Sequence, residues 1–373
     1  MRTRRTLAVL GLIAAIVAAS PALGRLSAAS PALGRLSAAA QAADTLPAKL
    51  TDQEFWHLSE DLSEPNGSFR SDNLVSNELW LQHVIPDLIK TVEPGRAYVG
   101  VGPEQNFTYI AALKPAMAFI IDIRRGNLDL HLMYKALFEL SADRTEFVSR
   151  LFSRKRPEGL TEQSTAADIF AAFKNVDRSQ ALHDETLQAI RGQFATHGFA
   201  LSEDDWSGIE YAIDAFSTFG SRINYLSTGT DSYGGSPLPT YADLMTATDA
   251  GGIAHSYLNS EDNFRFMKDL ETRNLVVPIV GDFVGPKAIR AVGGYLRDRG
   301  ASVSAFYLSN VEMYLEREMT WGSFCRNVAA LPLDARSLFI RSAFDGRYGH
   351  GFGLNSDLGP VLREIEHCAP SQQ

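Results

Sequence analysis

The sequence predicts an α/β fold with a mostly parallel sheet and a large helical insertion. Short apolar runs alternate with amphipathic helical segments at both ends of the chain, and a long middle segment has no strand pattern. Strands joined by helical crossovers pair in parallel and are buried on both faces, so they are apolar throughout. The expected sheet is therefore Rossmann-like. Five strands are expected, at residues 97–101, 117–121, 275–280, 303–308 and 337–342.

Residues 1–42 are predicted to be a signal peptide. Arg2, Arg4 and Arg5 form a basic start, residues 7–19 form an apolar core too short to span a bilayer, and residues 40–42 (AQA) resemble a cleavage site. The Arg4-Arg5 pair is also a feature of twin-arginine export signals. We therefore expect an exported protein, periplasmic or secreted, with no integral membrane segment after cleavage.

Charge and cysteine content narrow the function classes. The net charge is −9, and the one basic run of the mature chain is the short cluster at residues 154–156, so nucleic acid is not an expected partner. No H-E-x-x-H or C-x-x-C motif occurs, so no metal site is predicted. Cys325 and Cys368 either pair, as exported proteins allow, or stay as two free thiols.

Residues 43–95 are expected to form a helical lead-in to the sheet. A helix is predicted over residues 71–92, where apolar residues have helical spacing, with Pro86 kinking or splitting it. Asn73, Asn77 and Glu78 on this helix either border a ligand site or form a solvated face.

Residues 95–122 carry the strongest functional pattern: a strand, a glycine turn, a short helix, a second strand and a terminal acid. Gly100 and Gly102 let the backbone turn sharply and approach a ligand, and Pro103 suits a helix start. Asp122 follows Gly102 by about 20 positions, the spacing at which an acid reaches a ribose hydroxyl in doubly wound folds. Gln105 stands where a dinucleotide fingerprint has its third glycine, which disfavours NAD and FAD. The alternative is an ordinary strand–turn–helix unit with glycines for geometry only.

The sequence divides the sheet into two halves, residues 96–156 and 274–373, around the insertion at 157–273. The predicted crossover helices cover residues 104–113, 127–140, 286–299 and 321–330, and a last short helix covers 361–367. Within the insertion, helices are expected at 165–173, 179–196 and 203–219. The Gly-, Ser- and Pro-rich residues 229–239 form either a lid or a surface connection, and the glycine-rich residues 344–354 form a loop.

Polar residues follow the later strands where each strand ends. Asp282 follows the third strand, Ser309, Asn310 and Glu312 follow the fourth, and Arg341-Ser342 ends the fifth. The carboxyl ends of parallel strands meet at one edge of a sheet, so these residues are expected to share a ligand site with the glycine turn. Singly, each has a bland alternative, such as a turn at Asn310 or a helix cap at Asp282.

These motifs resemble those of the class I S-adenosylmethionine-dependent methyltransferase-like superfamily. The resemblance covers roughly residues 97–140 and 275–342, and rests on the two-glycine turn, the acid after the second strand, Asp282, and YLSNVEMYL at residues 307–315. The chain also resembles a family of exported bacterial proteins with GVGPEQNFTYI and YLSNVE motifs. The resemblance implies the following roles: Gly100, Gly102 and Glu104 hold the methionine part, Asp122 the ribose and Asp282 the adenine, while Ser309 and Asn310 face the transferring group.

The expected function is therefore S-adenosylmethionine-dependent transfer, most simply of a methyl group, to a small-molecule or lipid acceptor. Ser309, Asn310 and Glu312 are the candidate catalytic residues; Glu312, Glu78 and His350 are the candidate bases for an acceptor with a bound proton. LSNVEMYL also resembles the aminocarboxypropyl transferases of betaine-lipid synthesis. Because S-adenosylmethionine is scarce outside the cytoplasm, an exported, non-catalytic binding protein on the same scaffold is the other alternative, unless twin-arginine export carries the cofactor out already bound.

Overall fold

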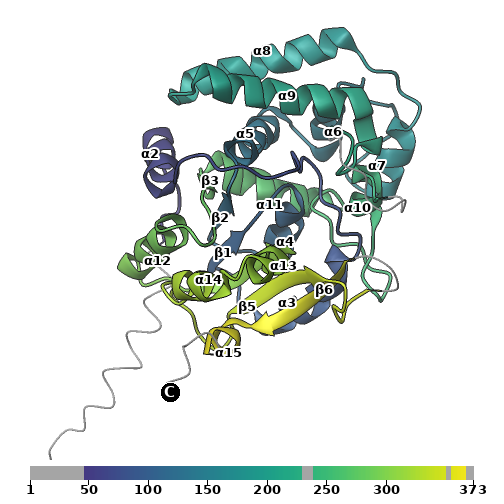
Figure 1. Cartoon of the computed structure of the whole chain (residues 1–373). Coiled ribbons are helices and arrows are strands. Elements are labelled where there is room, and N and C mark those ends of the chain that lie inside the picture. Colours follow the sequence, from purple (N-terminus) through teal and green to yellow (C-terminus); the bar gives the residue numbers. More distant parts are fainter. Residues whose placement is uncertain (1–45, 229–237, 350–353, 367–373) are drawn as a thin grey trace, which may run out of the picture. The chain divides into compact units, whose positions relative to one another are not determined.

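Six strands form one sheet in the order β3-β2-β1-β4-β5-β6 in the computed structural model (Figure 1). The structure describes residues 46–228, 238–349 and 354–366. The first five strands run parallel and β6 is antiparallel to β5. Their bounds are β1 Ala97–Gly100, β2 Met117–Asp122, β3 Val276–Val280, β4 Val303–Ser309, β5 Leu338–Ala343 and β6 Asn355–Pro360. The α/β class and the mostly parallel, Rossmann-like sheet predicted from the sequence are thus confirmed.

The sixth strand was not predicted. Its sequence, NSDLGP, is polar and contains glycine and proline, which are depleted in strands. It pairs with β5 over six positions, from Leu338 opposite Pro360 to Ala343 opposite Asn355. An edge strand is bonded on one side only, so Pro360 at its end is tolerated where a central strand would lose a ladder bond.

Helices cover both faces of the sheet (Figure 1). The apolar stripes of these helices bury the strands, which are fully buried from β1 to β3. One face carries α4 and α5, against which α3 and α11 (Glu261–Thr272) pack; the other carries α12 and α14, and α2 lies beside β3. Their bounds are α2 Asp52–Leu62, α3 Ile85–Thr91, α4 Gln105–Leu113, α5 Arg125–Leu140, α12 Ala288–Asp298 and α14 Trp321–Val328.

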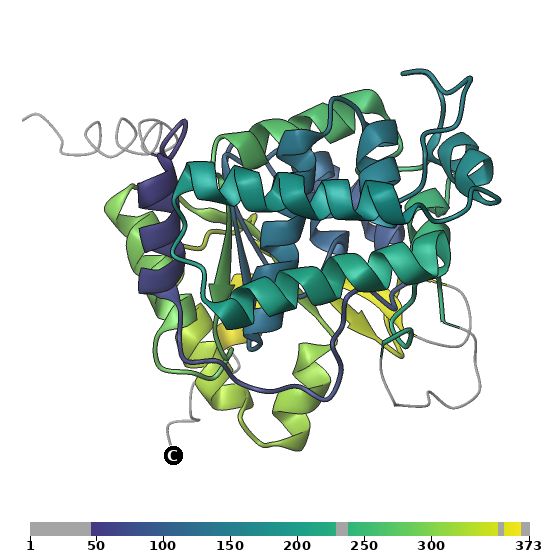
Figure 2. The ribbon, with the colours of Figure 1, turned by 90° about the horizontal axis from the view of Figure 1, so that it is seen from above.

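The predicted helical insertion is present and packs mainly on α5. Two long helices, α8 and α9, run antiparallel over it (Figure 2). Polar N-caps begin these helices: Ser179 caps α8 and Ser202 caps α9 with a capping box. Residues 229–237 of the suggested lid lie outside the described residues. The helices of this region are α6 Arg144–Phe152, α7 Ala166–Phe173, α8 Gln180–His197, α9 Glu203–Phe219, η3 Gly220–Arg222, α10 Tyr241–Thr246 and α11 Glu261–Thr272.

The helix predicted over residues 71–92 is wrong in its first half. Helical structure begins only at η2 Leu81–Val84 and continues in α3, whose first turn contains Pro86. Before it, the Ser71 hydroxyl accepts from the Asn73 amide at 3.2 Å and the Ser76 hydroxyl accepts from the Glu78 amide at 3.1 Å. Such side-chain bonds replace the amide bonds that a helix would use, and they leave residues 71–80 irregular.

The end of the chain adds two short helices, α13 Val311–Arg317 and α15 Val361–Glu366. Cys325 on α14 is disulfide-bonded, and Cys368, the other cysteine of the sequence, lies outside the described residues, as do the predicted signal peptide and His350. Over the part of the chain that the structure describes, no helix has the length and apolarity needed to cross a membrane.

Candidate functional site

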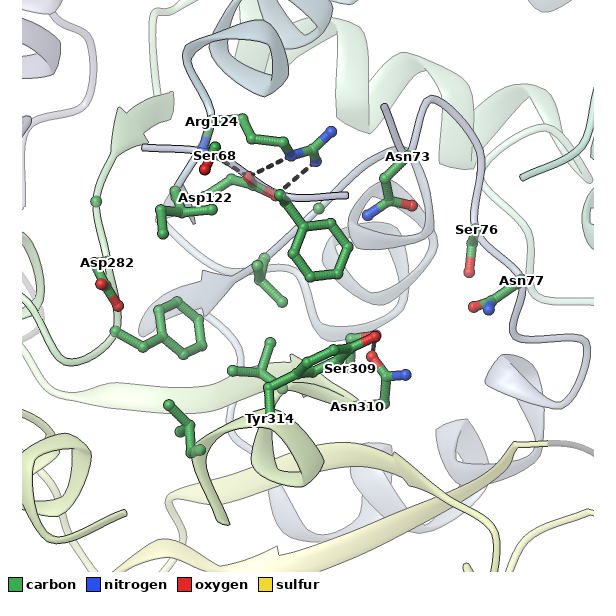
Figure 3. A pocket seen from close by; sticks show the side chains of 18 of the residues that line it. Ser68, Asn73, Ser76, Asn77, Asp122, Arg124, Asp282, Ser309, Asn310 and Tyr314 are labelled. Carbon is green, nitrogen blue, oxygen red and sulfur yellow. Dashed lines mark hydrogen bonds and ion pairs between the residues drawn. The ribbon is translucent and has the colours of Figure 1, made fainter. Parts of the chain in front are cut away.

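A cavity of about 260 Å³ lies at the carboxyl ends of β1 to β4 (Figure 3). This edge is where open parallel sheets bind ligands. The ends of the four strands, residues 68–78 and α13 form its wall, and the insertion contributes Tyr225. The sequence-predicted residues that line it are Asn73, Asn77, Glu78, Gly102, Asp122, Asp282, Ser309 and Asn310. The structure thus brings together residues that the sequence places on separate segments.

The glycine turn after β1 forms part of the cavity wall at Gly102. Gly102 has a φ of +77°, which favours glycine, and a Cβ there would lie 3.4 Å from Asn73 Nδ2 and from Gln105 Nε2. Asn106 fixes the turn: its Nδ2 donates to the carbonyls of residues 101, 102 and 103 at 2.8–3.2 Å. Gly100 does not line the cavity. The space beside its Cα is filled by Asn106, whose Oδ1 a Cβ at this position would overlap.

Asp122 points into the cavity at the end of β2 and is held by Arg124 (Figure 3). Arg124 Nε donates to one carboxylate oxygen and Nη2 to the other, each at 3.0 Å, and the Arg124 amide donates to Oδ1. Arg124 Nη1 also donates to the carbonyls of Ser71 and Asp72, which ties the lead-in to this strand end. A carboxylate has about four acceptor sites, so Asp122 keeps capacity for a ligand hydroxyl. Arg124 was missed, although it follows the expected acid by two residues.

Asp282 lines the cavity at the end of β3, beside an apolar wall of Ile123, Phe283, Val284 and Leu315. Its Oδ1 accepts from the Val284 amide at 3.0 Å, so Asp282 closes a turn and does not cap α12. The start of α12 is served by Glu64, whose carboxylate accepts from the amides of Lys287 and Ala288 at 2.7 and 2.8 Å.

Glu78 forms part of the cavity floor and is 1% exposed. Its Oε1 accepts from the Tyr307 hydroxyl at 2.7 Å and from the Ser309 hydroxyl, while Oε2 has no partner in the described structure. Burial raises the pKa of Glu78, against the hydroxyl groups of Ser309, Ser342 and Tyr307, which lower it. The solvated helical face considered for Glu78 is therefore ruled out.

The family described as a domain of unknown function (DUF7790) matches residues 73–357. The chain belongs to this family. No curated protein matches the chain.

The family domain begins at Asn73 and so includes the cavity residues from all four strand ends and the insertion. Glu64, Ser68 and Phe69 precede it, yet Ser68 and Phe69 line the cavity. The site of the family domain is therefore completed by residues of the preceding lead-in.

Two non-glycine residues of the cavity wall have left-handed backbone conformations: φ is +47° at Asn73 and +53° at Ser309. Such conformations cost free energy and cluster at functional sites. At Ser309 the strand pairing between β4 and β5 also shifts register. The conformation directs the Ser309 hydroxyl toward Glu78, and Asn310 lies beside it in the cavity wall (Figure 3).

Glu312 lies away from the cavity that holds Ser309 and Asn310. Its carboxylate is 3.1 Å from Arg341 Nε on β5, an ion pair without hydrogen-bond geometry, and Arg341 also lies 3.6 Å from Glu364. Burial raises the pKa of Glu312 to about 7, and the neighbouring carboxylates add to the rise against the influence of Arg341. The structure therefore separates Glu312 from the two residues with which the sequence grouped it.

Glu104 is fully buried beneath the glycine turn and does not line the cavity. Its Oε1 accepts from the Ser76 amide at 3.3 Å, which holds the lead-in against the turn. Burial raises the pKa of Glu104 to about 8, and the carboxyl of Glu78 adds to the rise. His131 supports the turn from below through a 2.9 Å bond between its Nε2 and the Gly102 carbonyl, and burial lowers its pKa to about 4.

Aromatic residues at one side of the cavity were also missed by the sequence analysis. Phe69 and Tyr314 both line it and pack edge to face, with ring centroids 5.4 Å apart. Arg70 Nη2 donates to the Tyr314 hydroxyl at 3.1 Å. These contacts join the lead-in to α13 and depend on residues some 244 positions apart, so no local sequence pattern marks them. Among the residues described, no cluster of His, Cys, Asp and Glu is arranged to hold a metal ion.

Proposed function

We propose that the cavity binds S-adenosylmethionine and that the protein is a transferase, most simply a methyltransferase. The observation that carries the proposal is the meeting of four strand ends around one cavity, with Gly102, Asp122, Asp282 and Ser309 in its wall. If each of these residues only stabilised the fold, the four would not need to line the same cavity. The carboxyl edge of a parallel sheet is the usual place for a nucleotide cofactor.

The cavity wall varies along its length in a way that suits this ligand. Ile123, Phe283 and Leu315 offer an apolar slot for an adenine ring beside Asp282. Asp122 offers a carboxylate for ribose hydroxyls, and Gly102 offers backbone without a side chain for the methionine part, as the resemblance implies.

The sheet topology supports the same proposal. The strand order 3-2-1-4-5 is followed by an antiparallel strand beside β5. The methyltransferase-like resemblance implies such an antiparallel partner at this edge of the sheet. An all-parallel dinucleotide-binding fold has a sixth parallel strand in that place.

Transfer from a sulfonium needs little from the protein beyond placement. The leaving group is already activated, so holding the acceptor in line with the methyl group supplies most of the acceleration. Ser309 and Asn310 line the cavity at the end of β4, and the resemblance implies that they face the transferring group. A non-catalytic binding protein on the same scaffold is the second candidate, favoured by the predicted export signal.

A thermal-shift experiment tests the proposal on the mature protein. S-adenosylmethionine or S-adenosylhomocysteine at 100 times its dissociation constant is expected to add about 2.7 kcal/mol of stability. Asp122→Asn is expected to weaken binding roughly tenfold or more, because a ribose hydroxyl loses its carboxylate and Arg124 faces an amide. Asp298→Asn, an exposed aspartate on α12, is the control and should leave binding unchanged.

The absence of a shift with both nucleosides would reject the proposal, and equal shifts in wild type and Asp122→Asn would reject the assigned ribose contact. If binding is observed, transfer of a labelled methyl or aminocarboxypropyl group distinguishes the two reactions. Binding without any transfer would favour the non-catalytic candidate.

A further inference from the structure

The cavity floor contains two acceptor oxygens without a hydrogen-bond partner in the described structure, Glu78 Oε2 and Gln105 Oε1. Both side chains line the cavity, and they are 1% and 2% exposed. Buried polar atoms are almost always satisfied by protein, water or ligand, because an unmade bond costs the full desolvation of the atom. Two such atoms on one cavity floor therefore point to a bound group that donates to both.

The hydrogen bonds beneath the floor orient both side chains. Gln105 Nε2 donates to the Tyr307 hydroxyl at 2.9 Å, and that hydroxyl donates to Glu78 Oε1 at 2.7 Å. This chain orients the Gln105 amide so that its oxygen is the unused atom. Ser309 also donates to Glu78 Oε1, and the Ser342 hydroxyl on β5 lies beside the same carboxyl, so hydroxyl groups of β4 and β5 hold Glu78 in place.

The charges around the floor favour a cation. Glu78 and the neighbouring Glu104 are both buried, and no lysine or arginine forms an ion pair with either in the described part of the chain. The other titratable groups that face Glu78 are tyrosines, namely Tyr98 on β1, Tyr109 on α4 and Tyr307 on β4, and none of them carries positive charge. Arg124, elsewhere in the cavity wall, is bonded to Asp122. Burial raises the pKa of both carboxyls, and an added cation would offset that cost.

We propose that Glu78 and Gln105 form a seat for an ammonium group, with Glu78 Oε2 and Gln105 Oε1 accepting its N–H donors. The inference rests on the proposed function and deepens it, since it names the group that the polar end of the cavity recognises. The ammonium belongs either to the amino-acid part of the cofactor or to an amine acceptor. Both sources have the same chemistry, and a choice of probes separates them.

Calorimetric titration with S-adenosylhomocysteine and 5′-methylthioadenosine tests the seat. The two share the nucleoside and thioether, and only the first carries an ammonium group. Wild type is expected to bind S-adenosylhomocysteine roughly tenfold or more tightly than 5′-methylthioadenosine, and Glu78→Gln is expected to remove that difference by placing an N–H donor at the seat. Glu316→Gln, which removes an exposed carboxylate of α13 outside the cavity wall, is the matched control and should keep the preference.

Ethanolamine, titrated alone and with 5′-methylthioadenosine bound, tests an acceptor amine. Binding that Glu78→Gln abolishes would assign the seat to the acceptor. If neither nucleoside binds wild type, the proposed function fails, while Glu78-dependent ethanolamine binding would still support the seat. Equal affinity for the two nucleosides, together with no Glu78-dependent binding of ethanolamine, would overturn the seat and leave the proposed function standing.

Melting curves accompany these titrations. Glu78→Gln replaces an unpaired buried carboxyl by a neutral amide of the same shape, so it is expected to melt at or above the wild-type temperature. Gln105→Met provides a second variant that removes one acceptor without adding charge. It is expected to weaken the binding of S-adenosylhomocysteine more than the binding of 5′-methylthioadenosine. The opposite order would contradict the seat.

Discussion

The turns that follow β1 and β3 begin alike and end differently. Each strand gives way to a glycine, Gly102 after β1 and Gly281 after β3, before a helix begins. In the β3 turn, the Glu64 carboxylate from the lead-in accepts from the amides of Asp282, Lys287 and Ala288 at 2.7–3.1 Å. A protein carboxylate thus occupies the place at the start of α12 where a bound anion would lie.

The β1 turn reverses this arrangement. Here the turn provides the carboxylate, Glu104, and the lead-in provides the amide, at Ser76. Within the described residues, no side chain from another segment accepts from the amides of Gly102, Glu104 and Gln105. Gly102 consequently faces the cavity uncovered.

The same lead-in therefore closes the β3 turn with a carboxylate and leaves the amides of the β1 turn uncovered. By filling the β3 turn, Glu64 makes it a fixed wall that presents Asp282 and Phe283. By donating the Ser76 amide to Glu104, the lead-in leaves the β1 turn open and places Asn73, Asn77 and Glu78 opposite it. Of the two turns, the β1 turn is therefore the open one at the proposed ligand site.

The largest expected effect comes from the buried carboxyl of the β1 turn. Burial raises the pKa of Glu104 from 4.5 to about 8, so the folded state holds a proton that the unfolded state releases. The stability that this proton gives is complete below pH 4.5 and is lost as the pH rises to about 8. Glu104→Gln keeps an oxygen for the Ser76 amide and removes the titration. We expect it to exceed wild type by about 3 to 5 kcal/mol above pH 8, with little difference near pH 4.5.

Urea unfolding across pH 4.5–8.5 measures this effect, and Glu318→Gln, an exposed glutamate, is the control. The free energy of unfolding of this control, plotted against pH, should run parallel to that of wild type. Parallel curves for wild type and Glu104→Gln would mean that Glu104 is ionised in the fold, and that the β1 turn holds its carboxylate as the β3 turn holds Glu64.

An intermediate effect is expected from emptying the β3 turn. Glu64→Ala removes the acceptor of three amide bonds from a half-buried position, so we expect a loss of about 2 kcal/mol. The freed amides at the start of the eleven-residue helix α12 then favour an anion. Sulfate is therefore expected to restore part of the melting temperature of Glu64→Ala and to leave wild type unaffected.

Glu60→Ala is the matched control from the same segment. Glu60 forms an ion pair with Arg125 at 3.1 Å and is partly exposed, so its loss should cost less than about 1 kcal/mol. It should show no rescue by sulfate. Equal responses of the two variants to sulfate would mean that Glu64 does not occupy an anion position.

Much of the fold could be predicted because its signals are local. Each of the five parallel strands is mostly apolar, and α9, predicted at residues 203–219, begins and ends as expected because Ser202 caps it and Gly220 follows it. Strand β6 could not be found this way, since its polar sequence forms a strand only through its partner β5. Residues 71–80 show the opposite error: apolar spacing suggested a helix, and hydroxyl–amide bonds prevent it.

The site was predictable only as far as its residues follow strands. Gly102, Asp122, Asp282 and Ser309 were found because the ends of parallel strands must meet. The role of Glu64 rests on contacts with residues far away in the sequence, 223 positions in the bond from Lys287 to Glu64. Arg124 binds Asp122 only two residues away, but no motif marks an arginine at that position. Glu312 shows that neighbours in the sequence need not share a site. It follows Ser309 and Asn310 closely, but the turn of α13 brings it to Arg341 on β5.

The smallest expected effect on stability comes from Gly102→Ala, and it separates backbone strain from ligand contact. At a φ of +77° an alanine costs about 1 kcal/mol, and its methyl group would lie at ordinary contact distance from Asn73 and Gln105. Gly95→Ala is the matched control, because Gly95 has a φ of +82° and open space around its Cβ position. Both variants should lose similar stability in urea, whereas only Gly102→Ala should lose S-adenosylhomocysteine binding, since its methyl group enters the open turn. Equal binding by the two variants would mean that the β1 turn, like the β3 turn, is only a wall.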